Sequence, residues 1–148
     1  MAKKFSGDMI MDGMEQEGSL VVAILAGAIA AIVGAGAWMG ITVATGLHVG
    51  YVALGIGALV GFAIRLSGSG TGIIFGIVGA VWTLLSCLTG EFLTQIQLAT
   101  TPQHDFYAVL ISVNMGDMLT TILNQTSPIT YLIYAIGIFE GYKLSIRK

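Results

Sequence analysis

The sequence is poor in charged residues, cysteine and proline. Only 9% of its 148 residues are Asp, Glu, Lys or Arg, against 55% that are hydrophobic, and this balance excludes an ordinary soluble domain. The single cysteine, Cys87, excludes an intrachain disulfide and a thiolate metal site. Two prolines beside 21 glycines disfavour a disordered linker and favour membrane helices packed closely at small side chains.

Sequence motifs of catalysis are also absent. The chain has no Gly-rich phosphate loop with a lysine, no H-E-x-x-H and no G-x-S-x-G. Its two histidines, His48 and His104, are too far apart in the sequence to indicate a metal site. We therefore expect no enzyme, no cofactor, no bound metal and no nucleic-acid partner.

What the chain does have is long apolar runs. No residue from Ser19 to Ile64 is charged if His48 is neutral, and a bilayer core needs only ~20 apolar residues per helix. This run has room for two spans, with a break at "TGLHVG". A third span follows "RLSGSGTG", and a fourth begins at Pro128 with Ser127 as its N-cap. The expected spans are about 19–44, 48–65, 72–92 and 128–145.

The first 18 residues are expected to form a cytoplasmic tail. They hold the acidic stretch "SGDMIMDGMEQEG", which is not the apolar core of a cleavable signal peptide. The first apolar segment should therefore stay as an anchor, and residues 19–148 should form a single transmembrane helical domain.

The basic residues predict which ends of the spans face the cytoplasm, because Lys and Arg are retained on that side. In a four-span chain, the N-terminal flank, the second connection and the C-terminal tail share one side. All six basic residues lie in those segments, and both termini are therefore predicted to be cytoplasmic: Lys3, Lys4, Arg65, Lys143, Arg147 and Lys148.

The segment between Glu91 and Ser127 is too long for a turn. Asn114, Asp117 and Thr121 recur on one helical face, and apolar side chains, among them Ile111 and Ile122, lie on another. We expect an amphipathic interfacial helix over about 102–124, starting near Pro102 or at Asp105. A re-entrant or spanning helix is less favoured, because Asp117 in the lipid core would cost roughly 2.5–3.5 kcal/mol.

Glycines recur at a spacing of four residues, which places them on one face of a helix. In lipid, such faces let helix backbones approach closely. We expect them to serve helix packing, within the monomer or between copies, and the pairs concerned are Gly36 with Gly40, Gly57 with Gly61, and Gly72 with Gly76.

Polar residues of the third span leave two interpretations open. Glu91 marks the exit of this span into the interface, or it belongs to a polar pocket near the outer face. In the second case the pocket would bind a cation or relay protons, and its residues would be Glu91, Thr94, Gln95 and His48, with His104 and Asp105 as further candidates. A transporter or channel would instead have a polar path along Thr83, Ser86, Glu91 and His48.

Glu140 lies in the last apolar stretch, about one turn from Lys143. A carboxylate at that depth is costly unless it is paired. Arg65 ends the second span on the same side, so we predict a structural ion pair of Glu140 with Arg65 or Lys143. The alternative is an ion site at Glu140.

The stretches "WMGITVATGLHVGYVALGIGALVGFAIR", "GIVGAVWTLLSCLTGEFLT" and "LIYAIGIFEGYK" together resemble a group of small bacterial inner-membrane proteins with four spans and no assigned function. The resemblance covers most of residues 36–143 and implies no chemistry. Some members of the group carry a zinc ribbon before the spans, which this chain cannot form with one cysteine.

The expected fold is an all-α, four-span integral membrane protein of the bacterial inner membrane, with an interfacial helix before the last span. The expected function is non-catalytic: a scaffold or accessory subunit that packs in a homo-oligomer, or with other membrane protein subunits, through glycine faces in contact with membrane lipid. The alternative is a small transporter or ion channel.

Overall fold

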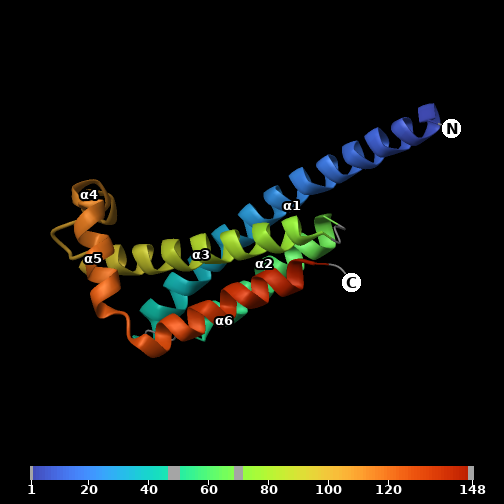
Figure 1. Ribbon diagram of the computed structural model, residues 1–148. Helices are drawn as coiled ribbons and strands as arrows, with labels where there is room; N and C mark the ends of the chain where they lie inside the picture. Colours follow the sequence, from blue (N-terminus) through green and yellow to red (C-terminus); the bar gives the residue numbers. More distant parts are fainter. Residues whose placement is uncertain (1, 47–50, 69–71, 147–148) are drawn as a thin grey trace.

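A computed structural model describes residues 2–46, 51–68 and 72–146, including their side chains except at 2–19 and 68. This part of the chain is mostly helical and contains no strand, which confirms the predicted all-α class (Figure 1). The six helices are α1 (Ala2–Thr45), α2 (Val52–Gly68), α3 (Ile73–Ala99), α4 (Phe106–Ser112), α5 (Met115–Gln125) and α6 (Pro128–Ser145).

The four long helices pack side by side in one bundle (Figure 1). α1 and α3 run in the same direction, since Gly27 lies against Trp82 while Trp38 lies against Gly90 further along both helices. α2 runs the opposite way to α1. The chain therefore runs one way along α1, back along α2 and forward again along α3.

α6 runs parallel to α2 and antiparallel to α3. On the α2 side, Gly57 meets Gly137, and Gly61 meets Gly141 one turn later. On the α3 side, Gly141 meets Gly79. At all three places a Cβ on glycine would contact backbone atoms of the facing helix, so the helices touch backbone to backbone. We call these five glycines, 57, 61, 79, 137 and 141, the glycine seam.

Two helices in the described chain are long and apolar enough to cross a membrane, Leu20–Thr45 within α1 and Ile73–Ala99. A third is possible if α4 and α5 are counted together, although they meet at a bend of 100°. Val52–Ser67 is apolar but shorter. These helices are compatible with a membrane protein, as the composition predicted.

Several predicted helix ends agree with the structure. α6 begins at Pro128, and the Ser127 hydroxyl accepts a hydrogen bond from the Thr130 N–H at 3.3 Å, so the predicted N-cap is confirmed. α1 ends at Thr45, and Gly46 follows with a φ of 67°, a conformation that glycine adopts without strain. At its other end α1 begins at Ala2, so the backbone of the expected tail is helical and continuous with the span.

The prediction of one continuous helix over 102–124 is wrong. Residues 101–104 form a turn, in which the Thr101 and His104 backbones exchange two hydrogen bonds, so the start near Pro102 is wrong. The first helix begins at Phe106 with Asp105 as its N-cap, which agrees with the alternative start at Asp105. The helix then breaks at Asn114, whose side chain accepts a hydrogen bond from the Gly116 N–H at 3.1 Å. Asparagine at such a position starts a new helix in place of continuing the old one. The two expected faces therefore do not extend across the break.

We predict that Gly57→Ala destabilises the bundle, because its Cβ would meet the backbone of Gly137 and force α2 and α6 apart. Overpacking of this kind costs about 1–3 kcal/mol. Denaturation in detergent micelles, followed by circular dichroism, measures the loss.

Gly55→Ala is the matched control, two residues earlier on the same helix, with no atom within 4 Å of the added Cβ. It should be neutral or stabilising by up to about 1 kcal/mol, since alanine favours the helix over glycine. Equal losses in the two variants would contradict the packing described.

Candidate functional site

Two residues of the predicted polar path lie inside the bundle with their hydroxyl groups already bonded. Thr83 is fully buried and donates to the Gly79 carbonyl of its own helix at 2.8 Å. Ser86 is 2% exposed and donates across to the Ala31 carbonyl of α1, also at 2.8 Å. Both side chains therefore bind protein backbone, and the second bond fastens α3 to α1.

Glu91 lies further along α3 and is only 6% exposed. Its carboxylate accepts a hydrogen bond from the Gln95 amide at 3.2 Å, and the same amide donates to Gln125 of α5 at 3.3 Å. These bonds connect the buried carboxylate to the helix that crosses the end of the bundle. His48, the fourth residue of the predicted path, lies outside the described residues.

Trp38 fills the space between α1, α3 and α6 at this end of the bundle. It is 2% exposed, contacts Gly90, and meets the Tyr134 ring edge to face, with centroids 5.5 Å apart. Its indole N–H has no hydrogen-bond partner among the described residues. Trp38 thus packs between helices.

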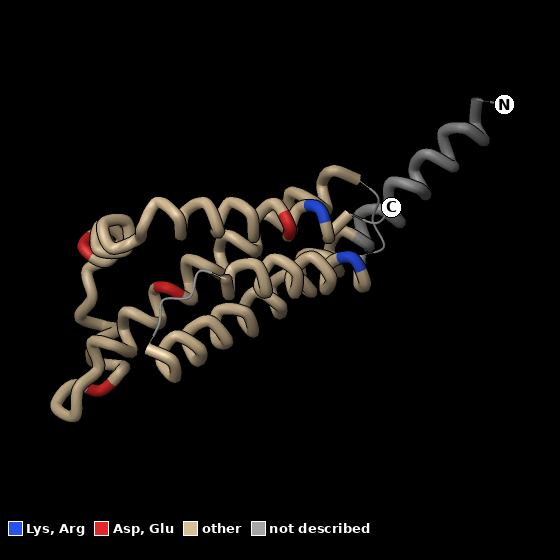
Figure 2. Tube along the Cα trace, turned by 90° about the horizontal axis from the view of Figure 1, so that it is seen from below, with Lys and Arg blue, Asp and Glu red and all other residues tan. Residues whose placement is uncertain are grey.

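Glu140 lies in α6, whose last turn holds Lys143, and Arg65 lies in the last turn of the parallel helix α2. In Figure 2 the two blue segments accordingly lie at the same end of the bundle. No ion pair joins Glu140 to either cation within the described part of the chain. The helix register explains the separation: Gly61 lies opposite Leu144, so Arg65, one turn later on α2, is level with the end of α6 beyond Glu140.

The glycines expected to serve packing have three different environments. Gly57, Gly61 and Gly76 lie in contact with α6. Gly72 is the N-cap residue of α3, where an added Cβ would meet only atoms of that helix, at 4.0 Å. The remaining pair, Gly36 and Gly40, has no atom within 4 Å, because it faces away from the bundle.

The exposed surface of α1 around this pair is apolar. Ile29 and Val33 precede the two glycines along the same helical face, with 66% and 57% of their surface exposed. Ala44 continues the face one turn after Gly40 and is also exposed. We call these five residues the outer face of α1.

No group of three His, Cys, Asp or Glu side chains that could hold a metal ion occurs among the residues searched, which are the described ones. No family model, curated protein or solved structure matches this chain.

Three glycines of the seam, Gly79, Gly137 and Gly141, were not among the glycines predicted from the sequence to serve packing. Gly137 and Gly141 stand four residues apart in "GIFEG", so their spacing was a usable signal. Gly79 lacks such a partner in the seam, since the position four residues later is Thr83, and only the structure shows its contact with α6. The bond from Ser86 to Ala31 has no sequence signal at all, because it depends on how α1 and α3 are aligned.

We predict that Ser86→Ala lowers stability by ~0.6 kcal/mol and at most ~1.7 kcal/mol, the range measured for hydrogen bonds between membrane helices. Ser145→Ala is the control: this hydroxyl is also buried, but it bonds the Gly141 carbonyl of its own helix. Denaturation in micelles should show the smaller loss for Ser145→Ala, and the reverse order would contradict the role given to Ser86.

Proposed function

We propose that this chain is a non-catalytic, four-span protein of the bacterial inner membrane, a scaffold or accessory subunit that self-associates through the outer face of α1. The observation that carries the proposal is the contrast between glycine pairs. The glycines of the seam contact a facing helix inside the bundle, whereas no atom lies within 4 Å of a Cβ added at Gly36 or Gly40.

The number of crossings is inferred from helix directions. α1 and α3 are parallel, and both have the length and apolarity of a span. A chain that crosses twice in one direction has to return between the crossings, and α2 is the helix that connects them. Its 17 residues extend ~26 Å at ~1.5 Å per residue. That length is close to the ~30 Å core of a bilayer, given some local thinning.

α6 supplies the fourth crossing. It has 18 residues, runs parallel to α2, and contacts both α2 and α3 through the glycine seam. The chain thus ends on the side where it began. Retention of Lys and Arg on the cytoplasmic side then makes both termini cytoplasmic. The resemblance of residues 36–143 to four-span inner-membrane proteins agrees with this topology.

α4 and α5 are assigned to the outer interface. α5 runs across the end of the bundle, not along it (Figure 1). Asp117, in its first turn, would be costly within the lipid core but is stable among headgroups.

Self-association follows from the outer face of α1. Small residues spaced by four allow two helices to approach until backbones touch, which is the main source of attraction between helices in lipid. A second copy of this chain is a suitable partner, because a two-fold axis brings the same Gly36 and Gly40 face to both sides of the contact.

The arrangement of polar residues favours this function over a transporter. Thr83 and Ser86 donate to backbone carbonyls. Glu140 adjoins Gly141, which meets Gly79 of α3, and Glu91 lies twelve residues, or ~18 Å, further along α3 than Gly79. These groups do not line one continuous path among the described residues.

Gly40→Leu is expected to weaken self-association at least about tenfold, equal to ~1.4 kcal/mol, because the added side chain keeps the two α1 helices apart. Light scattering in mild detergent, over a range of protein concentrations, measures the mass of the particle. The wild type should be a dimer or larger, and the variant should be shifted to monomer.

Gly55→Leu serves as the control, since Gly55 is likewise an exposed helical glycine with no atom within 4 Å, but on α2. It should leave the particle mass unchanged. A wild type that is a monomer without a partner, or equal effects of both variants, would contradict the proposal.

A further inference from the structure

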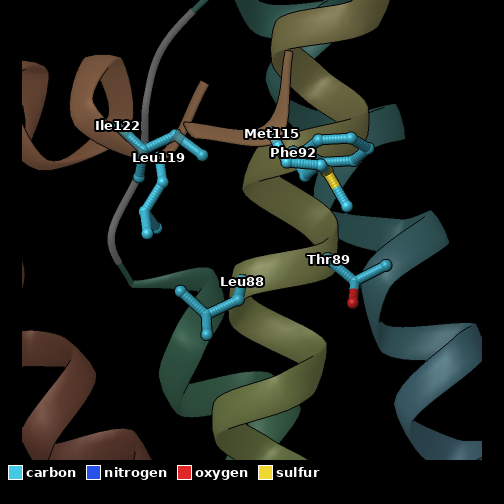
Figure 3. Close-up of a pocket in the computed structure, with 6 residues that line it drawn as sticks. All are labelled: Leu88, Thr89, Phe92, Met115, Leu119 and Ile122. Atoms are coloured by element: carbon cyan, nitrogen blue, oxygen red, sulfur yellow. The ribbon is translucent and has the colours of Figure 1, made fainter. Parts of the chain in front are cut away.

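A hollow of about 350 Å³ lies in the corner between α3 and α5 (Figure 3). α3 forms its upright wall and α5 lies across the top. Six residues line it, five of them apolar: Leu88, Thr89, Phe92, Met115, Leu119 and Ile122. Figure 3 shows the Leu119 and Ile122 side chains extending from α5 toward the level of Leu88.

The lower wall of the hollow continues the lipid-facing surface of α3. Leu84, Leu85 and Leu88 are 40–44% exposed on a helix that is long and apolar enough to span the membrane. On the upper wall, Met115 is 71% exposed and Leu119 is 52% exposed. Contiguous exposed apolar side chains of this kind are typical of surfaces that contact a membrane or bind a ligand.

We propose that this hollow binds one acyl chain of a phospholipid, with its headgroup above α5. The hollow opens directly onto the part of α3 that lipid surrounds, so a neighbouring lipid reaches it without crossing water. Its width is set by α5, which is held in place by the bond between Gln95 and Gln125 and by a second bond from the Tyr131 hydroxyl to the Leu123 carbonyl at 3.0 Å.

The charges at this end of the bundle select the headgroup. The sequence has no Lys or Arg from residue 66 to residue 142, so neither α3 nor α5 offers a basic partner to an anionic lipid. Asp117 is two residues from both Met115 and Leu119, so it lies on the face of α5 away from the hollow, and it is exposed. A headgroup that carries an ammonium group, such as phosphatidylethanolamine, is therefore favoured over phosphatidylglycerol, which has only a negative charge.

This inference requires that α3 crosses the membrane, but it does not depend on self-association. A monomeric protein that binds the lipid would contradict the proposed function alone, and a dimer without the lipid would contradict this inference alone.

The test uses the full chain in vesicles of equal parts phosphatidylethanolamine and phosphatidylglycerol. A trace of either lipid carries a photoreactive diazirine near the end of one acyl chain. After irradiation, mass spectrometry counts adducts on the residues that line the hollow. Adducts on Ile129 and Leu132 of α6 give the bulk-lipid reference, since both are more than 60% exposed and lie near the same end of the bundle.

The ratio of hollow to reference adducts should be about two- to fivefold higher with the ethanolamine lipid, the range that one exposed charge contact supplies. This comparison needs no variant. Equal ratios for the two lipids, or a higher ratio for phosphatidylglycerol, would overturn the headgroup assignment. A hollow labelled no more than the reference by either lipid would overturn the site itself.

Two tryptophan variants then test the place of binding. Leu119→Trp fills the hollow and should reduce its adducts several-fold while leaving the reference adducts unchanged. Leu123→Trp is matched to it, because Leu123 is on the same helix, is also 52% exposed and does not line the hollow. Unchanged hollow labelling in Leu119→Trp, or an equal loss in both variants, would overturn the inference.

Discussion

The rest of the structure depends on backbone contact at the glycine seam. Lipid is as apolar as the side chains that face it, so helices in a membrane gain little from the hydrophobic effect and need close dispersion contact. α6 needs this contact most, since it carries Glu140, Lys143 and three tyrosines and is not apolar enough to qualify as a span by itself. Gly137 and Gly141 let α2 and α3 approach it from two sides. The position of α6 in turn determines where α5 lies, because only Thr126 and Ser127 separate the two helices.

This packing divides the molecule into a closed interior, an open side and two unlike ends. The interior contains the seam and the bond from Ser86 to Ala31, so its small and polar residues are used within one chain. The open side is the outer face of α1. Arg65 and Lys143 lie at one end, whereas the other end has only acidic charges among the described residues, together with the hollow beneath α5 (Figure 2). In the proposed scaffold, the outer face of α1 would contact a second copy, and the two unlike ends would orient the protein in the bilayer.

The sequence was sufficient for the features that depend on one segment at a time. Apolar runs located the long helices, and Ser127 with Pro128 located the start of α6. The sequence did not predict the features that depend on how one helix packs against a neighbouring helix. Gly36 with Gly40 has the same spacing as Gly57 with Gly61, yet one pair is open and the other is covered. Likewise, the missing contact between Glu140 and Arg65 depends on how far α2 is shifted along α6. The break at Asn114 was missed for another reason: hydrophobic periodicity does not register a cap within an apolar segment.

The central claim is that α2 and α6 cross the membrane as well as α1 and α3, and cysteine labelling tests it directly. In a Cys87→Ser background, single cysteines are placed at exposed Thr45, Ser67, Asn124 and Lys143. Thr45 and Ser67 mark the ends of α1 and α2, Asn124 of α5 marks the side on which α6 begins, and Lys143 marks the end of α6. A membrane-impermeant maleimide is added to intact spheroplasts and then to lysed ones. The account predicts labelling of the Thr45 and Asn124 positions before lysis, and of the Ser67 and Lys143 positions only after it. Labelling of the Thr45 and Ser67 positions together before lysis would show that α2 does not cross, and would contradict the account.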